Sequence, residues 1–591
     1  MNGVEGGYHE RPLENAVSVM PKLAAIREKA KRLHQQGKLA EALQIHGEAL
    51  RLVPSAIGIW LSAARLAHTM GLQEVSLPYF EQAARLDPYC YPAIDAARRI
   101  CIAVGLYDRA LHYSQKAYEL NPAAEILVGL KLIVPAIARS IEGIHETRLR
   151  YEQNVDAVLR SNFRLDQPDG VLGASAFFLA YQGEMDKELQ IKTARMFLHA
   201  IPNLAMTAPH CIAAVRRPGK IRIGFISRFF CSHSIFATSR GLIEKLSRKN
   251  FEVYALRITP SRDDDSTRKI REAADFAIDL DADIYKARDQ VAALELDILF
   301  YQDIGMEPTS YFLAFSRLAP VQCVSFGHPN TTGISTIDYF ISNDLYETEN
   351  SHSHYSETLY ILQDLPTLAY YYRPTGALHD LNREDFGLPV GKTLYVCPQT
   401  LYKVHPDFDR LVRGILERDP NGIVIFINGQ FAEFTDHLRD RLVRGLGPCA
   451  QRVIFLQRMG FQRFLRLLAV TDVVLDTIHF NGMNSSLEAF SVGTPIVTLP
   501  TELQRGRHTQ AMYKRMQIFD CIAKDDSDYV EIAVRLGTDK IYAGELRERI
   551  RFRSHVLFED YRVIEEFERF FFEAFRAKIG EIENIDSMSL G

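Results

Sequence analysis

Hydrophobic positions near the start of the chain follow the spacing of amphipathic helices and repeat with a period of 34 residues. Three segments align without gaps: "GKLAEALQIHGEALRLVP", "GLQEVSLPYFEQAARLDP" and "GLYDRALHYSQKAYELNP". Four positions recur in every copy, and they are Gly37, Gly71 and Gly105; Ala49, Ala83 and Ala117; Leu52, Leu86 and Leu120; and Pro54, Pro88 and Pro122. The pattern predicts a stack of helical hairpins.

A period of this length, with small residues where helices cross and a Pro closing the second helix, is typical of tetratricopeptide repeats. We predict three repeats over residues 22–125, preceded by a polar tail at 1–21. The concave groove of such an array is usually a docking surface for a peptide or protein. Residues 126–215 remain helical but lose the period, which predicts a helical adaptor.

From Lys220 onward, short apolar runs alternate with amphipathic stretches. The runs are "IRIGFIS", "FEVYALRI", "FAIDL", "LDILFYQ" and "VQCVSFG", then, after a polar crossing, "KTLYVCP", "GIVIFIN", "RVIFLQ", "DVVLDT" and "TPIVTLP". This alternation predicts two doubly wound α/β domains with parallel sheets, at residues 216–380 and 381–560, and a ligand cleft at the carboxyl ends of the strands. Residues 561–591 are expected to form a helix whose aromatic face packs back across the two halves.

Composition narrows the class of protein. The net charge of -5 and the absence of a basic block give no reason to expect a nucleic-acid partner. The N-terminus has no apolar core of a signal peptide, and no apolar run approaches the ~20 residues of a membrane span. The eight Cys are scattered without a C-x-x-C pair, so we expect reduced thiols in a cytoplasmic protein.

The stretch "HFNGMNSSLEAF" follows a predicted strand and has two interpretations. Ser485 and Glu488 have the spacing of a capping box, in which each side chain satisfies the other's end of the helix start. A helix start is also an anion site, because its first N–H groups lack partners and its dipole favours negative charge. Taken alone, the pattern favours the cap.

Several motifs together resemble the O-GlcNAc transferase/SPINDLY family of GT-B glycosyltransferases. They are "RIGFISRFFCSHSI", "APVQCVSFGHPNTTGISTIDYFISND", "YSETLYIL", "LYKVHPDF", "DVVLDTIHFNGMNSSLEAFSVGTPIVTLP" and "RGRHTQAMYKRM". The resemblance implies a tetratricopeptide array followed by a GT-B domain of two Rossmann-like halves. It also implies an inverting transfer of a sugar from a nucleotide donor, UDP-GlcNAc or a UDP-hexose, to a Ser/Thr or Asn side chain of a protein that the repeats recruit.

The resemblance places the donor site in the second half. The strand-to-helix turn at Asn484 and Ser485 matches the diphosphate site, Glu488 matches the ribose ligand, and Lys403 matches the lysine on the donor phosphates. The complete donor set is Gln399, Thr400, Lys403, Phe464, Asn484, Ser485, Ser486, Glu488, Arg505 and His508.

Two donor-side positions leave alternatives open. Thr400 stands where the family has Gln three residues before the lysine, and Gln399 precedes it. Phe464 matches the side chain that stacks on uracil, but its helical spacing with Phe461 and Leu467 also fits a core role.

On the acceptor side, His233 matches the family histidine that faces the reacting sugar, and His328 lies in a loop expected to rim the cleft. The resemblance thus implies catalytic roles for His233 and Lys403, and it leaves open whether His233 is the base or only positions the reactants. Met483 replaces a polar group near the sugar, which puts GlcNAc as the donor sugar in question.

Two acidic clusters, Asp263 to Asp265 and Asp279 to Asp283, contain the D-x-D pattern of metal-dependent glycosyltransferases. Because they lie in the acceptor-side half, we expect solvated loops, no metal and no cofactor beyond the sugar-nucleotide co-substrate. Two alternatives remain: a repeat scaffold with an inactive GT-B domain, and a transferase acting on a non-protein glycan or lipid. Bacterial relatives with repeats are associated with flagellin or adhesin modification, and nothing in the sequence selects such an acceptor.

Overall fold

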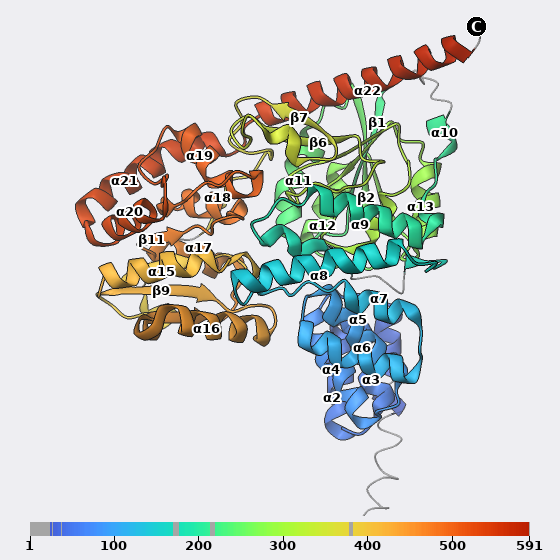
Figure 1. Ribbon diagram of the computed structural model, residues 1–591, viewed down its shortest axis with the longest axis horizontal. Coiled ribbons are helices and arrows are strands. Elements are labelled where there is room, and N and C mark those ends of the chain that lie inside the picture. Colours follow the sequence, from blue (N-terminus) through green and yellow to red (C-terminus); the bar gives the residue numbers. More distant parts are fainter. Residues whose placement is uncertain are drawn as a thin grey trace, which may run out of the picture. The chain divides into compact units, whose positions relative to one another are not determined.

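The computed structural model describes residues 24–26, 28–36, 38–168, 176–212, 219–376 and 382–589, with side chains up to 578 (Figure 1). The predicted tail at 1–21 and Gly37 of the first repeat lie outside these residues. The chain forms two compact units, one of Met1–Cys101 and Asp108–Ala123 and the other of Ile102–Tyr107 and Ala124–Gly591.

The repeated sequence positions correspond to repeated structural roles. The helices are α2 (Leu39–Leu52), α3 (Ile57–Thr69), α4 (Gln73–Leu86), α5 (Tyr91–Ala103) and α6 (Tyr107–Leu120). Ala49, Ala83 and Ala117 are completely buried, as expected where helices approach closely. Gly71 and Gly105 adopt φ values of +72° and +70°, which glycine tolerates best, after the helices that precede them.

The helical adaptor is part of the second unit. It comprises α7 (Ala124–Lys131), α8 (Ile141–Leu159), the 3-10 helix η2 (Ala176–Tyr181), α9 (Lys187–Ala200), the 3-10 helix η3 (Pro202–Leu204) and α10 (Pro209–Ile212). Ser140 caps α8 by accepting the N–H of Gly143 at 3.0 Å. The domain boundaries proposed above stay predictions.

The first α/β half contains a seven-stranded parallel sheet of order β3-β2-β1-β4-β5-β6-β7. Its strands are β1 (Ile221–Ser227), β2 (Phe251–Ile258), β3 (Phe276–Leu280), β4 (Ile298–Tyr301), β5 (Val321–Val324), β6 (Tyr339–Asn343) and β7 (Thr358–Leu362). Its helices are α11 (Ser234–Lys245), α12 (Asp265–Ala273), α13 (Ile284–Ala293) and α14 (Pro308–Leu313). The apolar runs predicted the first five strands; β6 and β7 extend the sheet beyond them.

The second half contains a five-stranded parallel sheet of order β10-β9-β8-β11-β12. Its strands are β8 (Thr393–Cys397), β9 (Gly422–Ile427), β10 (Val453–Leu456), β11 (Val473–Leu475) and β12 (Ile496–Val497). Its helices are α15 (Asp407–Arg418), α16 (Ala432–Leu446), α17 (Phe461–Val470), α18 (Asn484–Ser491), α19 (His508–Met516), α20 (Asp526–Thr538) and α21 (Lys540–Arg553). In both sheets the strand order reverses beside the first strand, which creates a crevice at its carboxyl end.

The last helix, α22 (Arg562–Ser589), returns to the first half (Figure 1, red). Its aromatic face enters the core of that half, where Phe567 lies 5.8 Å from Phe300 between ring centroids and Phe570 and Phe571 are fully buried. The end of the chain therefore completes the core of the first half. All eight cysteines are free, and within the described residues no helix is long and apolar enough to cross a bilayer.

Candidate active site

A cavity of about 370 Å³ is lined by both α/β halves, at the carboxyl ends of their strands. Nine of the residues singled out in the sequence line it: His233, Gln399, Thr400, Lys403, Phe464, Asn484, Ser485, Glu488 and His508. They come from the segments that follow β1, β8, β10, β11 and β12. Lys403 and α18 flank the switch point between β8 and β11, where open α/β sheets bind ligands.

Lys403 brings a positive charge to the cavity wall. It lies at the end of a 3-10 helix, η6 (Leu401–Lys403), rather than at the end of a strand. Its Nζ donates to Gln399 Oε1 at 3.2 Å and to the Asn481 carbonyl at 3.1 Å, and it lies 4.6 Å from the centre of the Phe480 ring. Burial lowers the pKa of Lys403 to about 8. Within the described residues no carboxylate lies within salt-bridge distance of the ammonium. The buried Asp476 favours the charged form of Lys403 from a longer distance, and an anionic ligand in the cavity would add a closer countercharge.

The start of α18 is open on the cavity side. Met483 is the N-cap residue, and no side chain caps the helix, so of the two interpretations of this stretch the capping box of Ser485 and Glu488 is not formed. Ser485 Oγ instead accepts a hydrogen bond from Gln399 Nε2 at 2.7 Å. The same Gln399 also accepts from Lys403, so one amide orients the lysine and the serine. The first N–H groups of the helix remain available to an anion.

Glu488, one turn into α18, lines the cavity and forms no capping contact. Burial raises the pKa of its carboxyl group to about 7. The desolvated carboxylate gains from hydroxyl donors, which stabilise its charged form. Its position near the helix start fits a ligand that carries hydroxyl groups next to an anion.

His233 reaches the cavity from the first half, as the N-cap residue of α11. Its Nδ1 accepts the backbone N–H of Ile235 at 3.2 Å, and its ring stacks on Phe229 at 4.3 Å between centroids. In a neutral imidazole whose Nδ1 is an acceptor, the proton is on Nε2. Burial, together with the charge of Arg262, lowers the pKa of His233 to about 4. The geometry therefore makes Nε2 a hydrogen-bond donor and favours positioning over the role of a base.

Aromatic and apolar side chains form the remaining wall, and most of them were missed in the sequence. Tyr181 of the adaptor stacks on Phe480 at 4.4 Å between centroids, and both line the cavity. Met306 and Phe326 of the first half and Met483 also line it. The run "AFFLAY" signalled an aromatic segment, but no local pattern could place it against a strand end some 300 residues away.

His508 contributes unused hydrogen-bonding capacity. Neither ring nitrogen has a hydrogen-bond partner within the described residues, and the same is true of Asn484 Oδ1. Burial, with a contribution from Lys403, lowers the pKa of His508 to about 3, so its ring is neutral. Buried polar atoms are rarely left unpaired, which is consistent with a polar ligand at this wall.

Three predicted residues do not line the cavity. The Arg505 guanidinium is buried in an ion pair with Asp186 at 2.9 Å and donates to Asn330 Oδ1 at 3.0 Å. The Ser486 hydroxyl is hydrogen-bonded to Thr509 at 2.8 Å. The loop of His328 lines the cavity as predicted, through Phe326, Gly327 and Pro329. The His328 ring itself is buried and stacks on Phe177 at 4.9 Å between centroids. Arg505 and His328 thus support the loops around the cavity.

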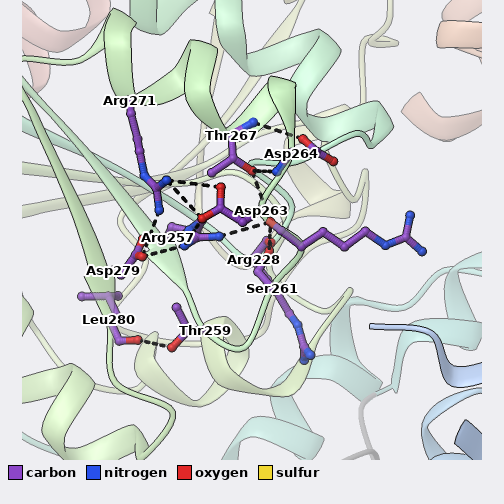
Figure 2. Close-up of polar contacts among 11 residues, drawn as sticks. Arg228, Arg257, Thr259, Ser261, Asp263, Asp264, Thr267, Arg271, Asp279 and Leu280 are labelled. Atoms are coloured by element: carbon purple, nitrogen blue, oxygen red, sulfur yellow. Dashed lines mark hydrogen bonds and ion pairs between the residues drawn. The ribbon is translucent and has the colours of Figure 1, made fainter. Parts of the chain in front are cut away.

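The acidic clusters are engaged in ion pairs and helix caps (Figure 2). Arg257 forms two hydrogen bonds to Asp279, at 2.8 and 2.6 Å, and Arg271 pairs with Asp263 and with Asp279 at 3.1 Å. Asp264 caps α12 by accepting the N–H groups of its first turn at 2.9 and 3.2 Å. These contacts account for the D-x-D patterns as structural features of the first half.

Comparison with known proteins agrees with this architecture. The model of glycosyl transferase family 41 matches residues 176–367 and 376–563. The chain is 23% identical over 448 residues to "Probable UDP-N-acetylglucosamine--peptide N-acetylglucosaminyltransferase SEC" of Arabidopsis thaliana, covering 72% of this chain and 45% of that protein. It is also 27% identical over 268 residues to a UDP-glucose:protein N-beta-glucosyltransferase of Actinobacillus pleuropneumoniae serotype 7. That match covers 44% of this chain and 40% of that protein. The chain thus spans less than half the length of these relatives.

A solved structure shares the fold across nearly the whole chain. It is a mutant of the O-GlcNAc transferase of Thermobaculum terrenum, with a TM-score of 0.65 and 21% identity over 96% of this chain and 99% of that one. The helical array followed by two Rossmann-like halves is therefore confirmed as the fold.

Proposed function

Since the chain belongs to glycosyl transferase family 41, we propose that it is a protein glycosyltransferase that uses a sugar nucleotide as its donor. The donor is a UDP-sugar, UDP-GlcNAc or a UDP-hexose. The acceptor is a Ser/Thr hydroxyl or an Asn amide of a protein, and the configuration at the sugar carbon is inverted. No cofactor takes part.

One observation carries this proposal: the cavity brings a buried ammonium without a paired carboxylate, Lys403, next to a helix start that no side chain caps. Both features favour an anion with several oxygen atoms, such as a diphosphate. Glu488 lies one turn along the same helix, within reach of ribose hydroxyls beside that diphosphate. Phe464 is available to stack on the base.

In the proposed reaction, the acceptor atom attacks the sugar carbon from the side opposite the diphosphate. The bond from that carbon to the diphosphate oxygen breaks, and its electron pair stays on the nucleoside diphosphate. The acceptor atom loses its proton as it bonds to the sugar carbon, and that proton passes to an oxygen of the departing diphosphate. Lys403 and the α18 N–H groups stabilise the charge that develops there, which is the usual role of fixed dipoles and cations in a closed site. His233 Nε2–H donates a hydrogen bond that orients donor and acceptor.

This arrangement supplies the positive field that other folds obtain from Mg²⁺ or Mn²⁺. We therefore propose a reaction that needs no divalent cation in the cavity. One carboxylate of each D-x-D cluster supports this, because Asp263 pairs with Arg271 and Asp279 pairs with Arg257 and Arg271. Adding Mg²⁺ or Mn²⁺ to protein stripped of these ions should leave turnover unchanged.

The acceptor requires a surface larger than the cavity, and the repeat groove is the proposed recruiting surface. The names of the two relatives cover both GlcNAc transfer to peptides and glucose transfer to protein. Met483, Met306 and Phe326 give the cavity an apolar wall, which offers few partners to an extra amide group on the sugar. This wall favours a hexose over GlcNAc.

The function is tested by three linked measurements on the full chain. Calorimetry with UDP, UDP-glucose and UDP-GlcNAc measures donor binding. Release of UDP in the presence and absence of cell extract measures turnover, and intact-protein mass analysis detects acceptor proteins heavier by one hexose or one N-acetylhexosamine. Donor binding with no turnover in any extract would overturn the enzyme assignment and favour a repeat scaffold with an inactive GT-B domain. A sugar found only on glycan or lipid would overturn the protein acceptor.

A further inference from the structure

Two histidines and an aspartate meet just outside the cavity wall. His405 and Asp407 lie between η6 and the first turn of α15, and His479 lies in the loop between β11 and α18. One potential ligand atom from each side chain lies within 4.8 Å of the other two. Within the described residues this is the one group of three or more His, Cys, Asp or Glu side chains with that geometry.

The two distances to Asp407 lie between the length of a hydrogen bond and the separation of neighbouring ligands of a tetrahedral metal ion. Asp407 Oδ2 lies 3.3 Å from His405 Nδ1 and 2.9 Å from His479 Nε2. A Zn²⁺ ion with bonds of about 2.0–2.1 Å to its ligands separates adjacent ligand atoms by roughly 3.3 Å in tetrahedral geometry. The imidazole rings lie next to each other, 4.5 Å apart between centroids and inclined at 75°.

The backbone at His479 is held in an uncommon conformation. Its φ is +67°, in the left-handed region that residues other than glycine adopt at a cost. The ring packs against Gly183, where a Cβ atom would lie only 3.0–3.2 Å from ring atoms. The fold therefore aims the imidazole of His479 at Asp407 through a local strain and a close approach that only glycine at position 183 allows.

Hydrogen bonds alone are the competing explanation for this arrangement. His479 can donate to Asp407, and the Asp407 N–H donates to His405 Nδ1 at a long 3.2 Å. A bound metal ion would replace both of these bonds, because the single lone pair of His405 Nδ1 cannot serve the Asp407 N–H and an ion together. Arg410 engages the other carboxylate oxygen, Oδ1, so Oδ2 stays between the two imidazoles. The side chains of Asp407 and His479 are 19% and 22% exposed, which admits an ion and a water as its fourth ligand.

We propose that His405, Asp407 and His479 bind one transition-metal ion, of which Zn²⁺ fits the donor set best. The ion would connect two loops that shape the cavity, since Lys403 lies two residues before His405 and Asn481 two residues after His479. Lys403 already donates to the Asn481 carbonyl across these loops. None of the three ligands lines the cavity, so the ion stabilises the donor site without touching the reacting atoms.

The test uses the full chain, free of any histidine tag. Metal content is measured after dialysis against equimolar Zn²⁺, and Co²⁺ is then added to metal-free protein to record its visible absorption. The variants are His479→Asn and His405→Asn; Asn tolerates the left-handed conformation at 479, so the loop should fold. The matched control is His352→Asn, which removes an exposed histidine far along the sequence from the group.

We expect one Zn²⁺ per chain, a tetrahedral Co²⁺ spectrum and a higher melting temperature with Zn²⁺ than without it. Each ligand variant should lose at least about 100-fold in Zn²⁺ affinity, beyond the effect usual for outer-shell changes, whereas His352→Asn keeps it. Mg²⁺ should not compete, because it prefers oxygen ligands. Equal Zn²⁺ content in wild type and in His479→Asn, or full displacement by Mg²⁺, would overturn the proposal and leave a hydrogen-bonded group.

Discussion

Replacing Lys403 by Met tests the proposed donor site most directly. The substitution keeps an apolar stem against the Phe480 ring but removes the ammonium, its hydrogen bonds to Gln399 and Asn481, and its charge. The expected result is a large loss of turnover with little change in stability.

Stability should change little because two effects offset each other. Burial lowers the pKa of Lys403 from 10.5 to about 8, so the charged form is less favourable in the folded than in the unfolded chain. That cost is fully present below pH 8, fades as the pH rises to 10.5, and amounts to ~3 kcal/mol at neutral pH. Met removes the cost but also removes two hydrogen bonds of a charged donor, each worth ~1.5–3 kcal/mol.

Catalysis should change greatly because the ammonium would face the diphosphate. A unit charge about 4 Å from another contributes roughly 4 kcal/mol at an effective dielectric constant of 20. Only the part that grows as the bond to the diphosphate breaks affects kcat. If about two-thirds of it grows, the loss is ~2.7 kcal/mol, or about 100-fold in rate.

The assay compares UDP release and UDP affinity for wild type, Lys403→Met and the exposed control Lys514→Met. In wild type, donor affinity should also weaken above pH 8, as the ammonium of the free protein loses its proton, and this pH dependence should vanish in Lys403→Met. Wild-type kinetics for Lys403→Met, with its fold intact, would falsify the placement of the diphosphate beside Lys403.

Three further substitutions address other parts of the cavity. Glu488→Gln should weaken donor binding several-fold, and calorimetry that finds unchanged affinity would remove Glu488 from the ribose site. Because burial raises the carboxyl pKa to about 7, the substitution should also raise the melting temperature at pH 8 and not at pH 4. His233→Asn should preserve stability, since Asn also caps helices, while transfer falls at least ~10-fold; a rate equal to wild type would refute the donor role of Nε2–H. Gly482→Ala should reduce donor affinity while the protein still folds, because the added Cβ would lie 2.4 and 2.5 Å from the side-chain ends of Gln399 and Ser485 and displace them. Full UDP affinity in titrations of this variant would contradict the expectation.

Much of the fold followed from local patterns. The 34-residue period placed Ala49 and Ala83 where helices pack and Gly71 where the chain turns, because a repeat needs the same steric solution in each copy. The apolar runs located the strands because a parallel strand buried on both faces has little polar sequence. Strands β6 and β7 were not recognised, because the apolar runs in "DYFISN" and "ETLYIL" are short and bounded by polar residues.

The candidate site was predicted less evenly. The motif resemblance identified nine residues that line the cavity, but it also included Arg505 and His328, whose side chains are buried against other elements. Both lie in the right loops, and the direction of a side chain within a loop is not encoded by its motif. Tyr181 was missed because the adaptor reaches the cavity only after folding.

The start of α18 shows where local information ends. Local sequence is enough to predict that a strand stops and a helix begins near Ser485, because apolar spacing and small polar residues act over a few neighbours. Long-range packing is needed for Ser485 to accept a hydrogen bond from Gln399, 86 residues earlier, and for Glu488 to line the cavity instead of capping its own helix. The two local bonds of a capping box stabilise a helix by ~1 kcal/mol, and a long-range hydrogen bond of similar strength is enough to replace them. When two hydrogen-bond arrangements have similar free energies, the one that forms depends on which distant groups the fold brings within hydrogen-bond distance, and a local sequence pattern does not contain that information.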